Sequence, residues 1–442
     1  MIKKELLKSF RFGSFVLVML LSICSSTLFS QDLHWIGLDN IDQSNPLDPS
    51  YVKVDSGFTL VLPGLSATLV QDGPVLGDYF KETDPGVFKL DFTDVINDFD
   101  DENGLGAEIA IPLIELDWRK GKGMISLSYG LRVMSDLVYQ KDLINLFHFG
   151  NVPFIGETMN LGIDASAFSY TELALGYSRD MGFINVGARV KLLSGIEDLS
   201  IADGKLDLYT DPDIYQLEVD SDIIINSSGS FDYNGLDDFS LDFNPVNYFQ
   251  FGKNMGFAFD LGISGDLGDK FSYQLAALDI GSISWDGDST FVYTSQDQTS
   301  FEGLDLLDFF DDEQDIVVED SLYQILEFEK ESISYSTDLY KKFIIGVNYQ
   351  ITDAIDLGGF YHINQYSKSP ISSFGISSKY KFRNQTASLL IAAVNGNPVV
   401  GLGTVLNLGP VQLIATTDNV LGVLGPDKVK YSSSRVGLNV SF

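Results

Sequence analysis

The sequence predicts an all-β fold, a transmembrane antiparallel up-and-down β-barrel that occupies residues 31–442. Three observations predict it: an N-terminal export signal, a period-two alternation of apolar and polar residues along the chain, and a last strand that ends on an aromatic residue. We trace about 14 strands, with roughly 12 to 16 as the range, because bacterial single-chain barrels have even strand numbers. Acidic extramembrane loops and short helices are expected to connect the strands.

Residues 1–30 have the three-part pattern of a secretory signal peptide. The apolar stretch Phe15–Ile23 is too short to cross a bilayer as a helix, and it ends before a small residue, Ser30. Signal peptidase is therefore expected to cut between Ser30 and Gln31. The basic head before the apolar stretch consists of Lys3, Lys4, Lys8 and Arg11.

The single cysteine, Cys24, lies inside this signal. A lipoprotein would carry its lipid on such a cysteine, but Ile23 is bulky where a small residue should precede it. We expect a mature chain without cysteine and without a disulfide. Small secreted domains usually need disulfides, whereas a large barrel is closed by backbone hydrogen bonds.

The net charge of the chain is −34, from 28 Lys and Arg against 62 Asp and Glu. Nucleic acid is excluded as a partner, because phosphate binding needs clustered basic residues. Electrostatic docking on anionic lipid is disfavoured for the same reason. The acidity indicates a solvated surface rather than a specific cation site.

The C-terminal segment Arg435–Phe442 alternates strictly between apolar and polar residues. Period two predicts a strand with one apolar and one polar face. A last strand that ends on an aromatic residue resembles the signal that the barrel-insertion machinery recognises, and an ordinary edge strand of a soluble sandwich is the alternative. The apolar residues of this barrel-assembly signal are Val436, Leu438, Val440 and Phe442.

The same alternation recurs in Ile125–Val133, Ile184–Leu192 and Phe257–Ile263. A soluble sandwich would hide the apolar face between two sheets, whereas a membrane barrel turns it toward lipid and lines the lumen with small or polar residues. Several charged residues therefore belong to the lumen, where acids and bases can pair. These predicted lumen-facing charges are Arg132, Glu172, Arg189, Lys191, Asp260 and Arg435.

Turn residues punctuate these strands at short intervals, whereas the links 194–250 and 286–336 are long, polar and acidic. Short turns on one side and longer links on the other fit an up-and-down barrel. We expect helices over Lys141–Phe149 and Asp320–Glu331, and place the long links outside the membrane or in the lumen. The predicted turns are Arg119–Gly123, Asp180–Gly182, Asp266–Asp269, Thr352–Ala354 and Gly409-Pro410.

No catalytic, metal or cofactor site is predicted. The histidines His34, His148 and His362 have no metal-ligand spacing, and packed or interfacial positions are the simpler interpretation of His148 and His362. No Gly-x-Ser-x-Gly elbow occurs. Asp98–Gly104 resembles a calcium loop only faintly, because its glycine is one position late and Ile109 stands where a bidentate Glu is needed.

The chain resembles Bacteroidota-type outer-membrane β-barrels of a family of unknown function. These are distantly similar to fatty-acid-transporter-like barrels and to membrane proteins of the type IX secretion and gliding apparatus. The resemblance covers nearly the whole mature chain, although Leu47 departs from the usual Asn-Pro-Ala. The stretches that carry it, in order, are Asn45-Pro46, Leu62–Ser66, Gly150-Asn151, Tyr170–Ser178, Gly187–Lys191 with Gly195, Asp279–Trp285, Thr417–Asn419 and Gly437–Phe442.

The resemblance implies location and fold better than activity. The leading hypothesis is a non-enzymatic barrel in outer-membrane lipid that anchors or assists a cell-surface or type IX secretion assembly, with envelope or secretion-system proteins as partners. The alternative is a pore or carrier for small hydrophobic molecules, and an enzyme comes third. Ordered extramembrane segments and a plugged lumen would favour the first, and a laterally gated lumen the second. A buried His-acid or His-Ser pair would favour the third.

Overall fold

The computed structural model describes residues 33–36, 47–52, 57–84, 87–229, 231–233, 239–241, 251–287, 290–301, 328–366 and 370–442. The predicted signal peptide and the Ser30–Gln31 junction lie outside these residues, so both stay predictions. Most of the predicted helix Asp320–Glu331 also lies outside them. At its end the prediction is wrong, because Glu329–Glu331 forms a strand.

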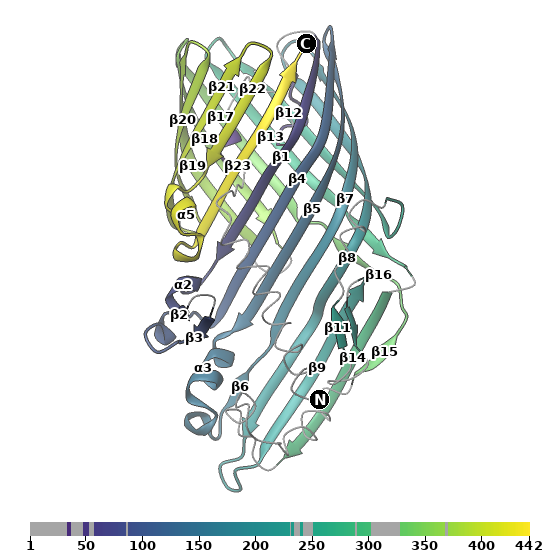
Figure 1. Cartoon of the computed structure of the whole chain (residues 1–442), viewed down its shortest axis with the longest axis vertical. Helices are drawn as coiled ribbons and strands as arrows, with labels where there is room; N and C mark the ends of the chain where they lie inside the picture. Colours follow the sequence, from purple (N-terminus) through teal and green to yellow (C-terminus); the bar gives the residue numbers. More distant parts are fainter. Residues whose placement is uncertain are drawn as a thin grey trace.

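Antiparallel strands close into a 14-stranded barrel, which confirms the predicted fold class (Figure 1). The first strand pairs on one side with β4 and on the other with the last strand, so the sheet has no free edge within the barrel. The barrel strands, in spatial order, are β1 (Gly57–Gln71), β4 (Glu102–Lys120), β5 (Gly123–Gln140), β7 (Ile163–Asp180), β8 (Asn185–Thr210), β12 (Met255–Leu267), β13 (Phe271–Trp285), β17 (Lys341–Thr352), β18 (Ile355–Gln365), β19 (Pro370–Phe382), β20 (Gln385–Val394), β21 (Asn397–Leu408), β22 (Val411–Thr417) and β23 (Tyr431–Ser441).

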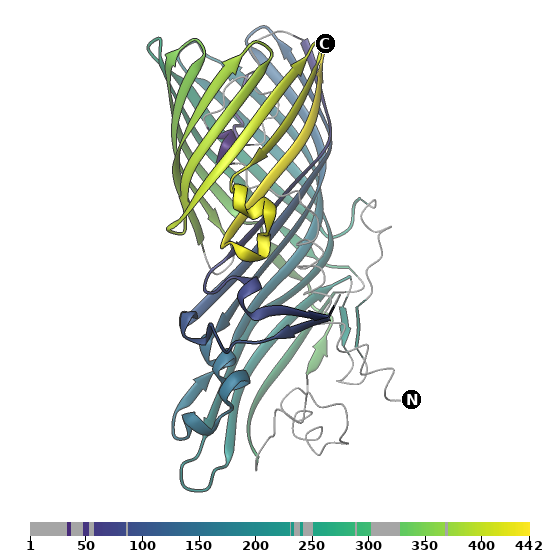
Figure 2. The same cartoon turned by 60° about the vertical axis from the view of Figure 1, so that its left-hand side comes forward.

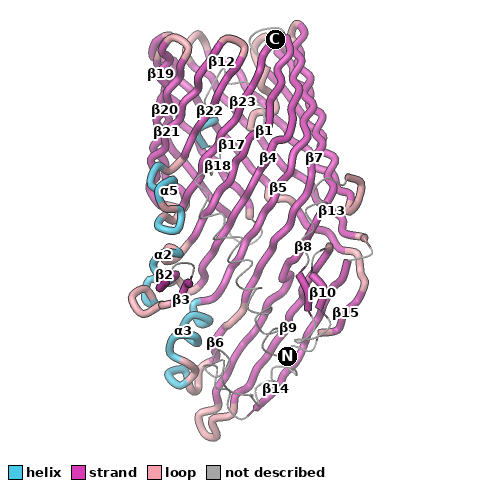
Figure 3. Tube along the Cα trace, viewed as in Figure 1, coloured by secondary structure: helices cyan, strands magenta, loops and turns pink. Residues whose placement is uncertain are grey.

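The apolar residues of these strands point outward, the reverse of a soluble protein. On β12, Phe257 and Phe259 are exposed, while Ala258 and Asp260, which alternate with them, are buried. A closed barrel pairs its backbone groups within the sheet, and its apolar outer face suits an outer membrane. Strands make up nearly all of the barrel wall (Figure 3). Among the described residues, no helix is long and apolar enough to cross a membrane.

Short turns gather at the end of the barrel where the chain ends (Figure 1). Left-handed glycines close several of them, including Gly121 and Gly409, both at φ +63°. In outer-membrane barrels the short turns face the periplasm. Phe442 pairs its backbone with Phe58 at this end, so the terminal strand completes the closure of the sheet.

The barrel has a second rim, at the end away from the short turns. β4, β5, β7 and β8 continue far beyond this rim (Figure 1). We call these projecting strand ends, together with the strands and helix that pack on them, the extension. β8 is 26 residues long and carries β9 (Leu217–Ser228), which pairs with β14 (Thr290–Phe301). The helix α3 (Lys141–Phe149) lies where the sequence predicted it. The remaining elements are η1 (Leu33–Trp35), α2 (Leu76–Tyr79), β2 (Phe80–Asp84), β3 (Val87–Leu90), η3 (Ile96–Asp98), η4 (Val152–Phe154), β6 (Thr158–Asn160), β10 (Phe231–Tyr233), β11 (Phe239–Leu241), β15 (Glu329–Glu331), β16 (Tyr335–Asp338), α5 (Val420–Leu424) and η7 (Pro426–Lys428).

The extension corrects the expectation of acidic extramembrane loops. Much of the acidic link 194–250 is strand, because apolar residues alternate with its Asp and Ser residues and pack together beneath α3. The apolar cluster that orders this part consists of Leu146, Met159, Leu161, Leu208, Leu217 and Val219. Burying this cluster offsets the conformational entropy of ordering the strands.

Candidate functional site

A layer of buried, paired charges fills the middle of the lumen. Arg132 on β5 lies 2.9 Å from Glu108 and 3.4 Å from Glu172. Lys191 on β8 lies 3.9 Å from Glu172 and 3.0 Å from Asp260. A buried charge without a partner is costly. Removing any one member of this layer would therefore leave its partner unpaired and destabilise the barrel. We call it the charge layer, and its members are Glu108, Glu172, Asp260, Asp279, Arg132, Arg189, Lys191 and Lys342.

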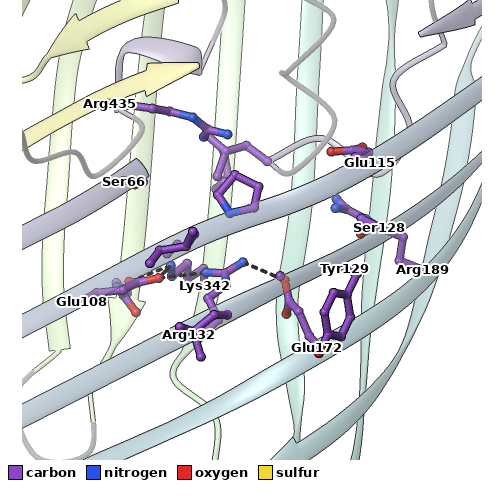
Figure 4. Close-up of a pocket in the computed structure, with 18 of the residues that line it drawn as sticks. Ser66, Glu108, Glu115, Ser128, Tyr129, Arg132, Glu172, Arg189, Lys342 and Arg435 are labelled. Atoms are coloured by element: carbon purple, nitrogen blue, oxygen red, sulfur yellow. Dashed lines mark hydrogen bonds and ion pairs between the residues drawn. The ribbon is translucent and has the colours of Figure 1, made fainter. Parts of the chain in front are cut away.

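One ion pair of the charge layer crosses the lumen. Lys342 belongs to β17 and Glu108 to β4, on nearly opposite walls of the barrel. The Lys342 Nζ lies 2.7 Å from Glu108 Oε1 and 2.8 Å from Oε2 (Figure 4). A direct contact between opposite walls leaves no wide water channel at this level.

A bulge in β13 brings Asp279 into the charge layer. Asp279 has φ +58°, a left-handed conformation that costs energy in a non-glycine residue. Its backbone N–H donates to Asp260 Oδ1 at 2.8 Å, and its carboxylate accepts a hydrogen bond from Lys191 Nζ. Strain of this kind persists where the surroundings compensate for it, and the Lys191 contact supplies that compensation.

Residues 33–36 lie inside the barrel against its β20–β22 wall (Figure 2). The carboxylate of Asp418 accepts hydrogen bonds from the backbone N–H of Leu33 at 3.2 Å and of His34 at 3.1 Å, and from the hydroxyl of Tyr431 at 3.0 Å. The His34 ring contacts Thr417 O at 3.0 Å and Ser388 Oγ at 3.2 Å. This contact is a buried His-Ser pair, the feature that would favour an enzyme, but the His34 side chain is fully buried and its backbone N–H is bonded to Asp418, so we interpret it as a packed anchor of the segment.

Residues 47–52 of the same segment lie against the other wall. Gln274 donates to Leu47 O at 3.0 Å, and Ser178 donates to Tyr51 O at 2.6 Å. Paired glycines on β8 and β12, Gly187 and Gly262, make room, since a Cβ at Gly187 would lie 1.8 Å from a backbone oxygen of residue 49. The segment is thus fixed at both walls, and we call residues 33–36 and 47–52 the plug.

The wall between β1 and β4 is interrupted. Their pairing stops at Val61–Glu115 and resumes at Ser66–Ala110, so residues 62–65 and 111–114 have no partner in this ladder. Both gaps hold a proline, Pro63 and Pro112, which has no backbone N–H to donate. Irregularities occur at the same level between β1 and β23 and between β4 and β5. We call this interruption the seam.

A cavity of about 80 Å³ lies between the plug and the seam (Figure 4). Its polar side includes Glu108, Arg132 and Lys342 of the charge layer. Its apolar side includes plug residues, wall residues next to the seam, and the buried Ile344 of β17. The apolar lining residues are Leu33, Ile36, Leu47, Ile111, Pro112, Leu131 and Ile344. The cavity therefore joins the lumen to the part of the wall where backbone pairing fails.

Five of the six charges that the sequence assigned to the lumen lie together in the charge layer. Arg435 lies apart, beside Ser66 on the β23 side of the cavity. His362 also lines the cavity, at a buried position. No group of His, Cys, Asp and Glu that could hold a metal ion occurs in the part of the chain that the structure describes.

Sequence reasoning missed four residues that organise the lumen. Asp279 shows a weak signal, because the alternation on β13 breaks beside it, and Asp418 lies in the Thr417–Asn419 motif that the resemblance used. Glu108 and Lys342 carry no local signal of a shared site, because they are 234 residues apart in the sequence. Only the closed barrel brings them into contact.

These features define an outer-membrane-type β-barrel with an occluded lumen. The chain belongs to the "Family of unknown function (DUF5723)", whose model matches residues 49–418.

Solved structures similar to this chain include the Ralstonia pickettii toluene transporter TbuX, at 10% identity and a TM-score of 0.43, covering 94% of this chain and 97% of that chain. A Pseudomonas aeruginosa FadL homologue is 9% identical with a TM-score of 0.43, covering 93% and 98%. The Pseudomonas putida toluene transporter TodX is 8% identical with a TM-score of 0.39, covering 94% and 98%. None of the curated proteins matches the chain.

Proposed function

We propose that this barrel is a conduit for small hydrophobic molecules, which pass between the lumen and the membrane through the seam. The observation that carries the proposal is the loss of backbone pairing between β1 and β4 in front of a lumenal cavity. The Leu62–Ser66 stretch on which the sequence resemblance partly rested forms one edge of the seam. The proposal assigns no catalytic step to the barrel.

The closed axis of the barrel argues against an aqueous pore. The Lys342–Glu108 contact joins β17 to β4, and the plug is hydrogen-bonded to Asp418 on one side and to Gln274 of β13 on another. A water-filled porin-type channel would need a polar, open lumen along its axis. A molecule that leaves sideways needs only a local opening at membrane depth.

The chemistry of the cavity fits an apolar or weakly amphipathic molecule. Plug residues Leu33 and Ile36 face the cavity together with wall residues such as Ile111 and Leu131. Non-helical or unpaired backbone at membrane depth is tolerated where it lines a cavity. At about 80 Å³ the cavity lies far below the roughly 300–1,000 Å³ of most ligand pockets, so a passing molecule requires the plug to move.

Covalent closure of the seam tests the proposal. Leu65→Cys with Ile111→Cys joins the two edges next to the paired residues Ser66 and Ala110. The expected mature chain has no native thiol to interfere. We expect the oxidised variant to lose uptake of the hydrophobic dye N-phenylnaphthylamine into proteoliposomes, and reduction to restore it.

The matched control places a disulfide in an unbroken part of the wall. Leu389→Cys with Leu402→Cys joins directly paired residues of β20 and β21, and both side chains face outward. This variant should take up dye equally well when oxidised or reduced. Uptake that survives a fully oxidised seam would refute the lateral route.

A second candidate function is the anchoring of an envelope assembly, including one linked to type IX secretion. The ordered extension favours it, because strands of this length exceed what the bilayer requires, and so does the plugged lumen. Replacement of residues 204–222, the outer part of the β8–β9 hairpin, by a short Gly-Ser turn tests it. Anchoring predicts the loss of co-purifying envelope proteins with dye uptake retained, whereas an unchanged set of co-purifying proteins would refute it.

A further inference from the structure

A second cavity, of about 290 Å³, lies at the mouth of the barrel where the extension begins. We call it the mouth pocket. It is larger than the cavity at the seam and shares no lining residue with it. The side chains that line it and carry the argument are Ser166, Ser200, Asn226, Thr337, Gln365 and Tyr366.

One wall of the mouth pocket is a row of neutral polar side chains. Ser166 on β7 pairs with Ser200 on β8, and Ser200 pairs with Asn226 on β9. Directly opposed residues on adjacent strands point to the same face. Two hydroxyls and a carboxamide thus line up across three strands, and each of these groups can both donate and accept hydrogen bonds.

The facing wall is held rigidly. Thr337 on β16 accepts a hydrogen bond from Trp285 Nε1 at 2.9 Å and donates to Asp198 at 3.2 Å. Asp198 also accepts from Tyr335 at 2.8 Å. A polar group that is fixed by its own partners loses little entropy when a ligand binds to it.

Aromatic rings border the mouth pocket. Tyr340 and Tyr366 both line it, with their ring centroids 4.8 Å apart. Phe168 packs against Tyr340 at 5.4 Å, so the rings form a firm apolar base next to the polar row. Apolar ring faces beside neutral hydrogen-bonding groups suit a ligand that is amphipathic on the scale of one ring.

The charges of the mouth pocket are largely compensated. Lys341 lies 3.0 Å from Asp338, and both residues line it. The remaining lining charge, Asp164, has an interaction partner of its own. Among the described lining residues, no cation without an acidic partner remains to select an anionic ligand. The Ser200 hydroxyl donates to Asp198 at 3.4 Å, but a purely apolar ligand would keep water from the Ser166 hydroxyl and the Asn226 carboxamide, at a cost in free energy.

We propose that the mouth pocket binds a neutral polyhydroxylated ring, the chemistry of a sugar. The row of Ser166, Ser200 and Asn226 would pair with ring hydroxyls, while Tyr340 and Tyr366 would contact a ring face. Its volume, at the small end of ligand pockets, admits a single sugar unit. The proposal does not depend on the seam, because it concerns other residues and a different class of ligand.

Trp285 provides a built-in probe, because it donates directly to a lining residue. The chain has 3 tryptophans, so Trp35→Phe with Trp118→Phe leaves Trp285 as the only one. Protein purified in a detergent without sugar is titrated with glucose, galactose, mannose and glucose 6-phosphate. We expect a saturable change of fluorescence with at least one neutral sugar and a weaker response to the phosphorylated one.

In the variant that keeps only Trp285, the further changes Ser200→Ala and Asn226→Ala should lower the affinity for that sugar by about tenfold. This is the effect of losing two neutral hydrogen bonds. The control Glu218→Gln changes an exposed residue of β9 outside the pocket and should leave affinity unaltered. Heat-modifiability on gels checks that each variant is folded. Equal affinity of the double variant, or glucose 6-phosphate as the tightest ligand, would overturn the proposal.

Octyl glucoside and octyl tetraethylene glycol ether separate two sources of the sugar. The two detergents share an octyl chain and differ in the head group. Saturable binding of octyl glucoside, without binding of octyl tetraethylene glycol ether or of free sugars, indicates the head group of a glycolipid. Binding of free sugars indicates a soluble ligand. Either result supports the pocket. The absence of a saturable response to all the sugars and to octyl glucoside would refute it, while dye uptake through the seam is measured separately and stays unaffected.

Discussion

The two sides of the barrel differ in strand length and in what the extra length does. On one side β7 and β8 have 18 and 26 residues, whereas on the other β18 and β20 have 11 and 10. About 9–11 residues suffice for a tilted strand to cross a membrane. The short side therefore does little more than cross the bilayer, and the long side carries additional structure.

The two sides also differ in regularity. Pairing between β19, β20 and β21 runs without a break, while β1 and β4 lose their pairing at the seam and β8 and β13 contain bulges. Irregular backbone costs free energy and is kept where it serves a site. The comparison teaches that the regular side holds residues 33–36 of the plug, whereas the irregular side holds residues 47–52 and contains the seam and most of the mouth pocket.

Asp418→Ala should have the largest effect of the substitutions that test this comparison. It removes the anchor that holds residues 33–36 of the plug on the regular side. Two backbone N–H groups and the Tyr431 hydroxyl lose their buried acceptor, at a cost of roughly 1–3 kcal/mol each. We expect the plug to leave its position and the ion conductance of the barrel in planar bilayers to rise clearly.

Asp353→Ala is the matched control, since Asp353 is exposed in the β17–β18 turn. It should leave conductance unchanged. If Asp418→Ala conducts no better than the native chain, Asp418 does not hold the plug closed.

Lys342→Met removes the ion pair that bridges β17 and β4, and its expected effect on stability is smaller. Met keeps the apolar stem of the side chain but removes the charge that contacts Glu108, which still has Arg132 as a partner. We expect a loss of about 1–3 kcal/mol, measured as a lower midpoint of thermal unfolding on heat-modifiability gels. The neighbouring Lys341→Met removes an exposed pair with Asp338 and should change the midpoint little. Equal shifts for both variants would contradict the bridge.

Asp198 on the long side should make the base of the extension sensitive to pH. Burial raises the pKa of Asp198 to about 7 from 3.8, although hydrogen bonds from Tyr335 and Thr337 oppose the shift. Since the folded pKa is above the unfolded one, the folded state binds the extra proton. The resulting stability is complete below about pH 4 and is lost as pH rises to about 7.

Hydrogen exchange of β16 measures this effect after correction for intrinsic exchange rates. Its protection should fall between pH 5 and 8 by a factor of about ten or more. Asp198→Asn should make protection independent of pH, whereas the exposed Asp213→Asn should not alter the profile. A native profile that is flat across this range would show that Asp198 is not the responsive group.

The barrel itself could be predicted because each lipid-facing strand shows its inverted alternation locally, as Phe257–Ile263 does. The paired lumenal charges followed from the same pattern, since Arg189 and Lys191 share a face with each other and not with Val190. These are properties of neighbouring residues, and a single strand suffices to reveal them.

The extension, the plug and the seam could not be predicted. The acidic composition of 194–228 hides the apolar face of its strands, and the plug depends on His34 meeting Asp418, 384 residues away. The seam is an absence of pairing between two strands, which Pro63 and Pro112 permit but do not specify. Contacts of this kind depend on closure of the sheet and leave no local pattern.

The most direct measurement of the central claim is whether the lumen behind the seam is accessible from the bilayer. A bimane label on Ala110→Cys would lie on the lumenal face beside the seam, and one on Ser377→Cys on the lumenal face of the regular side. In proteoliposomes that contain lipids with a nitroxide on the acyl chain, we expect quenching at position 110 and little at position 377. Equal quenching at both positions, or none at position 110, would contradict a lateral opening between β1 and β4.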